Sequence, residues 1–443
     1  MAENKYSNYF PEKYDNIDEF WEKSYPADKA EFLNILSPDL LKDFLDKIDF
    51  MSLSEIIKDL DYQTSNFIAQ TYDTDKLSKI LTSMYSDDAA DFLGTMPVGK
   101  VKAILDKLRA TQALELQRLL GYSEESAGGL MNTQFIAFYE DNTVDKVLSK
   151  LRDLISEPEM IYYIYIISRT KELKGVLSVR QLLAAEPDEI MKNIMSQEVI
   201  DVQINMDQED VADVLNKYDL LAVPVVNKKN QLVGIITVDD IIEVIEDEAT
   251  EDIYKMAATT DVYDVKGGLL SIVKKRIPWL LILLVGDLLS GSVIKNFEAS
   301  LQAIVALAFF IPVLMDMGGN VGTQSLAVVV RGLATGKLYL SNYLSHIWRE
   351  IKVGLIMALI LGLAISAIVL YWQGDPKLGI VVGVSMFATL LTAIIVGTSV
   401  PFIMDAVGVD PALASGPFIT TIVDITGLFI YFYMATILIN NYL

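Results

Sequence analysis

The chain has 443 residues, 52% of them hydrophobic, a formal net charge of -23, no cysteine and a single histidine, His346. This charge argues against a nucleic-acid partner, which would need a basic face. The absence of cysteine and the single histidine exclude thiolate and multi-histidine metal sites. The oxygen ligands that remain, which are carboxylates, amides and carbonyls, are those of Mg²⁺ and Ca²⁺.

Residues 1–24 are expected to form a variable N-terminal tail, followed by a helical domain over residues 25–127. The first residues are polar and lack the apolar core of a signal peptide, so this acidic part is expected to stay in the cytoplasm. Within 25–127, apolar residues recur three and four positions apart, as in 40–45 and 101–108, which predicts short amphipathic helices. Polar turns such as Ser86-Asp87-Asp88 separate them, a pattern typical of a stacked helical superhelix.

Residues 128–192 and 193–248 form an internal repeat. Met131 in the first copy corresponds to Met195 in the second, and Gly-Val-Leu-Ser-Val at 175–179 corresponds to Gly-Ile-Ile-Thr-Val at 234–238. Each copy runs through a polar turn, a helix, apolar β-branched strands and a closing helix, which predicts an α/β fold.

The repeat resembles a tandem pair of CBS domains, and the second copy matches better, through Val223-Pro224-Val225-Val226. In CBS domains that bind adenine nucleotides, a Thr or Ser and an Asp three residues later often hold the ribose. The resemblance places these residues on Thr237 and Asp240, so ATP is an expected ligand of the second copy. The first copy has Ser178 and Gln181 at these positions and lacks the acid. Alternatively, Thr237 only caps the following helix.

Eight acidic residues and no basic residue lie between positions 239 and 252, where the second copy leads into a predicted connecting helix over residues 249–272. If this run is helical, four of the acids share one face at spacings of three and four and repel one another. A hard divalent cation would relieve the repulsion, so we expect a divalent-ion sensor; alternatively, the run is a solvated acidic face. The residues are Asp239, Asp240, Glu243, Glu246, Asp247, Glu248, Glu251 and Asp252.

Residues 273–443 predict an all-α domain that crosses membrane lipid. Five stretches reach the roughly 18 mostly apolar residues that a span requires, at 277–294, 301–330, 353–371, 378–404 and 412–439. Lys274, Lys275 and Arg276 precede the first span, and further basic residues lie between the second and third. By the positive-inside rule, the N-terminal part is therefore expected inside and the C-terminus outside.

The second span contains an unusually polar stretch. Asp316 and Asn320 lie at i, i+4 among glycines, one turn after Pro312, which is expected to disrupt the helix. Broken segments of this kind expose backbone and side-chain oxygens to an ion. Alternatively, the glycines form a small-residue face on which another helix packs.

The fifth span contains Asp424 near mid-bilayer, where a charge should face a partner or water. Thr420 and Thr421 lie one turn earlier and would extend a polar stripe on the same helix face. One carboxylate per subunit, with hydroxyl groups around it, suits Mg²⁺, which loses its water reluctantly. Asp287 in the first span is a further intramembrane acid, which either hydrogen-bonds within the bundle or adds a cation site.

A helical domain, two CBS domains, an acidic connecting helix and five spans that contain Met317-Gly318-Gly319-Asn320-Val321-Gly322-Thr323-Gln324 resemble the MgtE-type magnesium channels. The resemblance implies a non-enzymatic, Mg²⁺-selective channel for magnesium uptake across the cell membrane. It implies a homodimer with the pore between the two membrane domains, which closes when cytosolic Mg²⁺ fills acidic sites. It places the pore acid on Asp424 and the acid at the cytoplasmic start of the fifth span on Asp410. The ion-site motif of the helical domain falls on Asp87, Asp88 and Asp91.

Two other functions stay open at this point. One is a secondary transporter that couples Mg²⁺ to Na⁺ or H⁺ through Asp287, Asp316 and Asp424, which only flux measurements under imposed gradients separate from a channel. The other is a membrane-anchored CBS sensor that moves no ion, against which the three intramembrane acids count. For the channel, the glycines of Lys266-Gly267-Gly268 are expected to be a hinge between the sensor and the first span.

Overall fold

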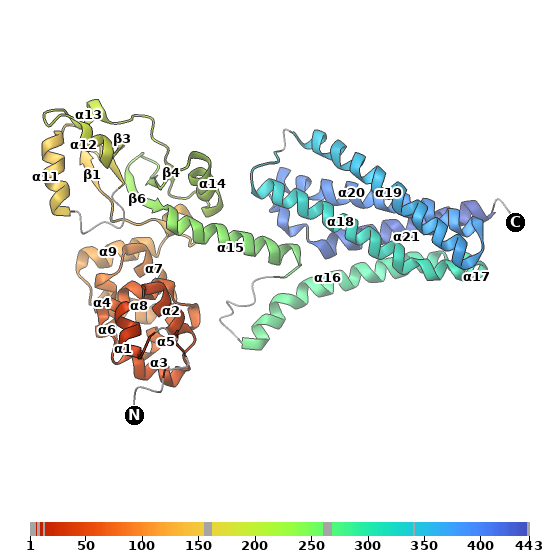
Figure 1. Cartoon of the computed structure of the whole chain (residues 1–443), viewed down its shortest axis with the longest axis horizontal. Helices are drawn as coiled ribbons and strands as arrows, with labels where there is room; N and C mark the ends of the chain where they lie inside the picture. The colour runs from red at the N-terminus through yellow and green to blue at the C-terminus, as the bar shows by residue number, and fades with distance from the viewer. Residues whose placement is uncertain are drawn as a thin grey trace. The chain divides into compact units, whose positions relative to one another are not determined.

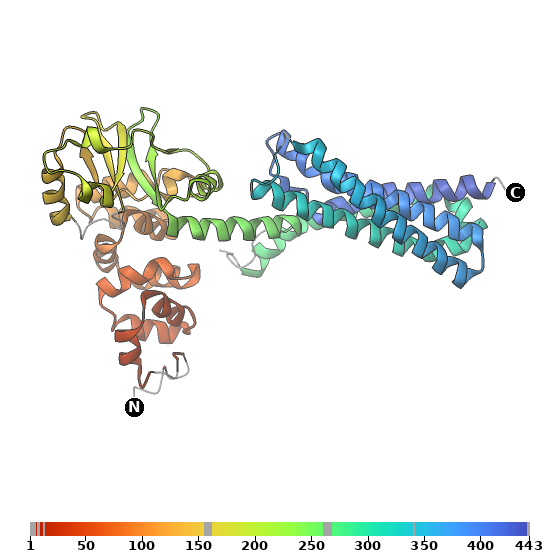
Figure 2. The same cartoon turned by 45° about the horizontal axis from the view of Figure 1, so that its top comes forward.

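The computed structural model describes residues 6, 9–11, 14–154, 162–259, 268–339 and 342–440. The chain divides into two compact units, Met1–Glu246 and Asp247–Leu443. The first unit consists of short helices and two small sheets, and the second consists mainly of long helices (Figure 1 and Figure 2). Lys266 and Gly267 of the expected hinge lie outside the described residues.

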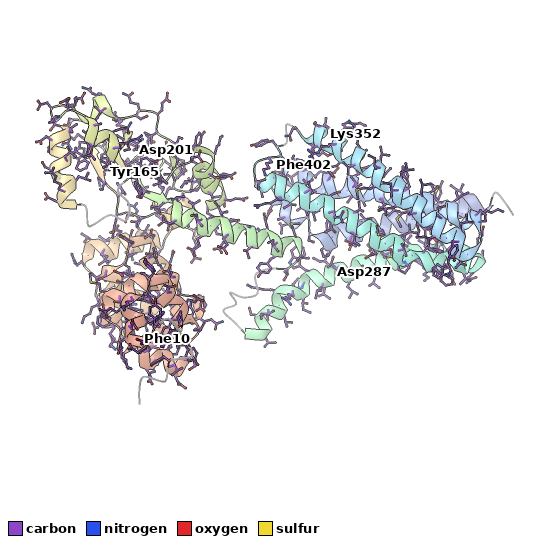
Figure 3. The ribbon with its side chains drawn as sticks, viewed as in Figure 1. Phe10, Tyr165, Asp201, Asp287, Lys352 and Phe402 are labelled. Carbon is purple, nitrogen blue, oxygen red and sulfur yellow. The ribbon has the colours of Figure 1, made fainter. Side chains whose placement is uncertain are left out.

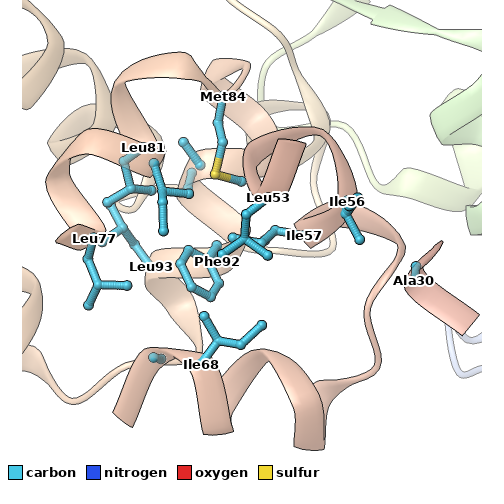
Figure 4. Packing of buried hydrophobic residues seen from close by; sticks show 14 of the residues in the cluster. Ala30, Leu53, Ile56, Ile57, Ile68, Leu77, Leu81, Met84, Phe92 and Leu93 are labelled. Atoms are coloured by element: carbon cyan, nitrogen blue, oxygen red, sulfur yellow. The ribbon is translucent and has the colours of Figure 1, made fainter. Parts of the chain in front are cut away.

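Short helices build the N-terminal part of the first unit, as expected. Asp49, Asp61 and Asp73 each accept backbone N–H groups at the start of the next helix, as N-cap residues do. Leu53 and Leu77 are fully buried in the core that these helices share (Figure 4). The helices are α1 (Ile17–Lys23), α2 (Pro26–Asn34), α3 (Pro38–Leu45), α4 (Phe50–Ile56), η2 (Ile57–Asp59), α5 (Tyr62–Thr71), α6 (Thr74–Ser83), α7 (Ser86–Gly94), α8 (Val98–Leu105) and α9 (Ala110–Leu119).

The described residues before position 25 pack onto these helices. Tyr6 is only 2% exposed and meets Phe44 edge-on, with the ring centroids 5.3 Å apart. Phe10, labelled in Figure 3, stacks on the buried Phe20 at 5.7 Å. Aromatic burial of this kind contributes strongly to a core. The described part of the segment expected to be a variable tail is therefore an integral part of the helical domain.

Two three-stranded sheets of identical order confirm the internal repeat. In each sheet the first strand pairs in parallel with the second, which pairs antiparallel with the third. A Cβ atom on Gly234 would clash with Met131, and one on Gly175 would clash with Met195. Each glycine thus lets the segment before one copy cross the third strand of the other. The elements are α10 (Ala127–Leu130), β1 (Ala137–Tyr139), α11 (Val144–Leu154), β2 (Tyr163–Ile167), β3 (Leu173–Ser178), α12 (Val179–Ala184), α13 (Met191–Ile194), β4 (Val202–Gln203), α14 (Gln208–Tyr218), β5 (Ala222–Val226), β6 (Leu232–Thr237) and α15 (Val238–Met256).

Among the described residues of the second unit, five helices are long and apolar enough to cross a membrane, which confirms the expected number of spans. The fifth begins at Gly416 rather than at 412, because residues Pro411–Leu413 form a separate 3-10 turn. The long helices are α16 (Gly268–Asn296), α18 (Ile311–Ala334), α19 (Tyr343–Gln373), α20 (Pro376–Ala406) and α21 (Gly416–Asn440), with the short elements α17 (Glu298–Ala303), η3 (Val305–Phe310) and η5 (Pro411–Leu413) between them.

The helix of the second span changes type beside Pro312, because the 3-10 segment η3 ends at Phe310 and α18 begins at Ile311. Pro312 occupies the first turn of α18, where its missing N–H removes no intrahelical hydrogen bond. Gly318 and Gly319 are buried within the continuous helix. A Cβ atom on Gly319 would lie 2.8 Å from the Thr420 side chain. The glycine-rich stretch is therefore a closely packed helix face rather than a broken segment.

Candidate functional site

The Asp424 side chain on α21 is buried in the membrane unit, with 7% of the residue exposed. Its Oδ1 has no hydrogen-bond partner in the part of the chain that the structure describes. A buried carboxylate oxygen without a partner is unfavourable, and more so in hydrocarbon. Asp424 is therefore suited to hold a group that the rest of the protomer does not supply, such as water or a cation.

Thr420 and Thr421 lie on the turn before Asp424. The Thr421 hydroxyl donates to the Pro417 carbonyl over 2.9 Å, so its oxygen can still accept a hydrogen bond or meet a cation. Thr420 is half-buried at the place where Gly319 leaves room for it. The hydroxyls thus continue the polar face of α21 from Asp424 towards the start of the helix.

Asp316 and Asn320 contact each other on the exposed side of α18. The Asn320 amide donates from Nδ2 to Asp316 Oδ2 over 3.2 Å, as the spacing of four residues predicts. Both residues are exposed in the protomer. In a membrane, such a face requires water or another protein surface.

In the first unit, Asp88 and Asp91 on α7 lie close enough to Asp240 and Glu243 on α15 for their charges to interact. Burial raises the pKa of Asp88 to about 6, although the Lys58 charge opposes the rise. Burial and the Asp88 charge raise the pKa of Asp91 to about 7. The Asp91 side chain is nevertheless solvent-exposed, so water screens part of this effect. A cation or a proton would relieve the repulsion in this cluster.

This acidic cluster is loose, because no three His, Cys, Asp or Glu residues among those that the structure describes are grouped closely enough to hold a metal ion. Asp87 also makes structural contacts: its Oδ1 accepts hydrogen bonds from Asn132 Nδ2 over 3.3 Å and from the Asp88 backbone N–H over 3.0 Å. Ser86 adds a 2.8 Å hydrogen bond to Thr133. Asp87, expected in the ion site, therefore helps to fix α7 to the segment that leads into β1.

Thr237 and Asp240 meet as their spacing predicts. The Thr237 hydroxyl donates to Asp240 Oδ2 over 2.6 Å, and Thr237 is fully buried. Burial raises the pKa of Asp240, although this hydrogen bond opposes the rise. Thr237 donates its hydroxyl hydrogen to Asp240 and so cannot donate it to a ligand, whereas Asp240 can still accept further hydrogen bonds. Ribose recognition by the pair therefore stays a prediction.

Lys255, which no sequence motif had singled out, lies between two of the expected sensor acids. Its Nζ donates to Asp410 Oδ2 over 2.7 Å and to Glu251 Oε1 over 2.8 Å. Burial works against the charge, but these hydrogen bonds raise the pKa of Lys255 above its ordinary value. Burial and the Asp410 charge raise the pKa of nearby Asp252. Lys255 thus neutralises the C-terminal end of the acidic run. The spacing of four residues between Glu251 and Lys255 could have predicted their ion pair from the sequence.

The other acids of the run lie along α15 away from its buried side, which is formed by Ile241 and Val244. Asp239, Glu246 and Asp247 are exposed, and Glu248 is half-buried. The run is helical, but it belongs to α15, which continues from the second CBS copy and ends at Met256 instead of forming a separate helix over 249–272. Most of its carboxylates can be reached by ions from solution.

Comparison with known proteins agrees with this arrangement. A model described as a divalent cation transporter, MgtE, matches residues 311–434. A model of the MgtE intracellular N domain matches residues 24–125, and a CBS domain model matches residues 191–247. A magnesium transporter MgtE from Bacillus subtilis is 38% identical over 93% of this chain and 89% of its own length. The chain belongs to the MgtE family. The family is one of transporters, so the chain is not an enzyme, and with its five spans it is a multi-pass membrane protein.

Other relatives cover the chain in a similar way. The Thermus thermophilus magnesium transporter MgtE is 40% identical over 83% of this chain and 80% of its own length. Among solved structures, the soluble part of a magnesium transporter covers 52% of this chain and 91% of that one at 30% identity, with a TM-score of 0.49. The cytosolic domain of the Mg²⁺ channel MgtE in complex with ATP covers 51% and 92% at 33% identity, also with a TM-score of 0.49.

Proposed function

We propose that this protein is a Mg²⁺-selective channel for magnesium uptake across the cell membrane. It works as a homodimer and closes when cytosolic Mg²⁺ neutralises its acidic sites. The observation that carries the proposal is Asp424, a buried carboxylate in the fifth span with one oxygen that has no partner among the described residues. The names of the relatives support magnesium as the ion.

The chemistry around Asp424 favours a hydrated ion. Mg²⁺ usually keeps several waters and is bound through one or two carboxylates. The Asp424 carboxylate would attract the ion, while the Thr420 and Thr421 hydroxyls would hydrogen-bond to its water. A two-fold axis would double these groups around a shared path. The exposed pair Asp316 and Asn320 on α18 would then face that path instead of lipid.

The proposed topology places the first unit in the cytoplasm and the C-terminus outside. Lys274, Lys275 and Arg276 at the start of the first span support this through the positive-inside rule. The acidic cluster of Asp88, Asp91, Asp240 and Glu243 would then face cytosolic Mg²⁺, to which it could respond. ATP at the second CBS copy is also part of the proposal, with Thr237 and Asp240 as its ribose-binding pair.

Mg²⁺ flux into proteoliposomes tests the proposal. The wild-type protein should conduct Mg²⁺ without any imposed Na⁺ or H⁺ gradient, and Mg²⁺ added on the cytosolic face should reduce the flux. Asp424→Asn keeps the size but removes the charge, and should abolish flux while the dimer still forms. Asp375→Asn is the matched control, because Asp375 caps α20 and Asn caps equally well. Wild-type flux in Asp424→Asn would refute the pore assignment.

A further inference from the structure

The membrane unit contains a third intramembrane carboxylate, Asp287, that the proposed function has not used. Asp287 lies on α16 (Figure 3) and is exposed in the protomer. Most of its neighbours on this helix are apolar and equally exposed, for example Leu284 at 53% and Leu288 at 65%. A lone charge on such a face is unfavourable in lipid. Asp287 therefore needs a partner that the described protomer does not provide.

The packing of α16 on α21 places Asp287 beside the proposed pore residues. The two helices run in the same direction (Figure 1) and come so close at Gly286 that a Cβ atom there would collide with the Thr421 methyl group. With a rise of about 1.5 Å per residue, Asp287 lies about 1.5 Å beyond this crossing and Asp424 about 4.5 Å beyond it. The two carboxylates are thus at nearly the same depth, and the Asp287 charge acts on Asp424.

A third side-chain oxygen, that of Ser290, lies on the same helix as Asp287 and close to the depth of Asp424. Ser290 follows Asp287 by three residues, is 4% exposed, and its Oγ has no hydrogen-bond partner among the described residues. At about 1.5 Å per residue it lies about 6 Å beyond the crossing, so Asp424 is between the levels of Asp287 and Ser290. Two buried oxygens without partners among the described residues, Asp424 Oδ1 and Ser290 Oγ, therefore lie on the same side of the crossing and about 1.5 Å apart in depth.

We propose that Asp287, Asp424 and Ser290 form a two-carboxylate site for a hydrated divalent cation within each protomer. The inference rests on the proposed function, and it adds a residue on the first span to the ion path. A second negative charge at the same depth strengthens the attraction for a divalent ion in a low-dielectric environment. The ion in turn neutralises Asp287, and its water satisfies the Ser290 hydroxyl. Asp287 then sets the concentration at which the path fills, whereas Asp424 is required for passage.

The test measures the initial Mg²⁺ flux into proteoliposomes as a function of Mg²⁺ concentration, with the full chain. Asp287→Asn should raise the half-saturating Mg²⁺ concentration about tenfold, because one of two attracting charges is lost, while flux at saturating Mg²⁺ remains. Ser290→Ala should raise it less, about twofold, because only a hydrogen bond to ion-bound water is lost. Leu288→Asn, a polar change at the next exposed position, is the control and should saturate as the wild type does.

Each outcome decides one assignment. A wild-type protein without Mg²⁺ flux refutes the proposed function and this site with it. If the wild type conducts, Asp424→Asn does not, and Asp287→Asn saturates like the wild type, this inference alone fails. If Asp287→Asn does not form a folded dimer by gel filtration, Asp287→Leu is measured in its place, because leucine suits a position that faces lipid. If neither neutral variant folds, Asp287 serves bundle packing and the site is overturned.

Discussion

The acidic residues of the membrane unit and those of the first unit are held in opposite ways. Asp424 is a single buried carboxylate at a helix contact so close that Gly319 leaves no room for a Cβ atom beside Thr420. Asp91 and Glu243 are exposed, come from segments far apart in the sequence, and interact through their charges. The membrane site depends on close packing around Asp424, whereas in the first unit several acidic residues each contribute part of the charge effect. A single substitution in the membrane unit should therefore abolish most of the Mg²⁺ flux, whereas single substitutions in the first unit should each change the response to Mg²⁺ only partly.

The largest effect should come from filling the helix contact in the membrane unit. Gly319→Val would place a side chain against Thr420, 2.8 Å from the position of the new Cβ atom. Overpacking of this kind destabilises a core by about 1–3 kcal/mol, and we expect most of the Mg²⁺ flux to be lost. The matched control is Gly291→Val, because a Cβ atom on Gly291 meets nothing within 4 Å. Equal loss of flux in both variants would show that the close contact between Gly319 and Thr420 is not specifically required for Mg²⁺ flux.

A graded effect is expected for the first unit. Asp91→Asn and Glu243→Gln should each raise the Mg²⁺ concentration that closes the channel by a few fold, and the double variant by about tenfold, since neighbouring charges are coupled. All three variants should still conduct when Mg²⁺ is absent from the cytosolic face. Asp188→Asn, an exposed acid in a turn of the first CBS copy, should close as the wild type does. Complete loss of closure in one single variant would contradict the idea of a shared sensor.

The pH dependence of the first unit follows from the same cluster. The folded pKa values of Asp88 and Asp91 are raised to about 6 and about 7, so their neutral forms favour the compact state, and stability is lost as pH rises through these values. Without Mg²⁺, the full chain should resist proteolysis better at pH 5.5 than at pH 8, and added Mg²⁺ should matter more at pH 8. Asp88→Asn with Asp91→Asn should remove most of this dependence. If the pH dependence of proteolysis is unchanged in that variant, other titratable groups cause it.

Sequence patterns predicted the parts of this fold that depend on local or repeated signals. The spans follow from long apolar runs, and the two sheets follow from corresponding strands on either side of Met195. The Asp316–Asn320 contact follows from a spacing of four residues on one helix. Each of these needs only the periodicity of a helix or strand, which the sequence contains directly.

Contacts between distant segments could not be predicted in this way. The Lys255–Asp410 pair joins residues 155 positions apart, and no periodicity relates them. Pro312 was interpreted as a break because proline disrupts helix interiors, whereas the start of α18 depends on the preceding η3 segment. The hydrogen bond that Asp87 accepts from Asn132 likewise joins residues 45 positions apart.

The smallest predicted effect concerns Lys255, which takes the place of a cation between Glu251 and Asp410. Lys255 and Asp410 are 23% and 35% exposed, so Lys255→Met should change the free energy of unfolding by about 1 kcal/mol or less. Its effect on ion binding should be easier to measure. Without the ammonium group the two carboxylates repel each other, so Mg²⁺ gains more by binding there.

Protection of the residues near position 250 from proteolysis, titrated with Mg²⁺ on the full chain, measures this effect. In Lys255→Met the midpoint should move to a Mg²⁺ concentration about two- to fivefold lower than in the wild type, and the difference between ion-free and ion-bound protein should increase. Lys228→Met, an exposed lysine in the turn between β5 and β6, should leave the midpoint unchanged. If the midpoint stays the same or rises in Lys255→Met, Lys255 forms an ordinary surface ion pair and does not compete with Mg²⁺ for this place. The sensor acids would then act through the first unit alone.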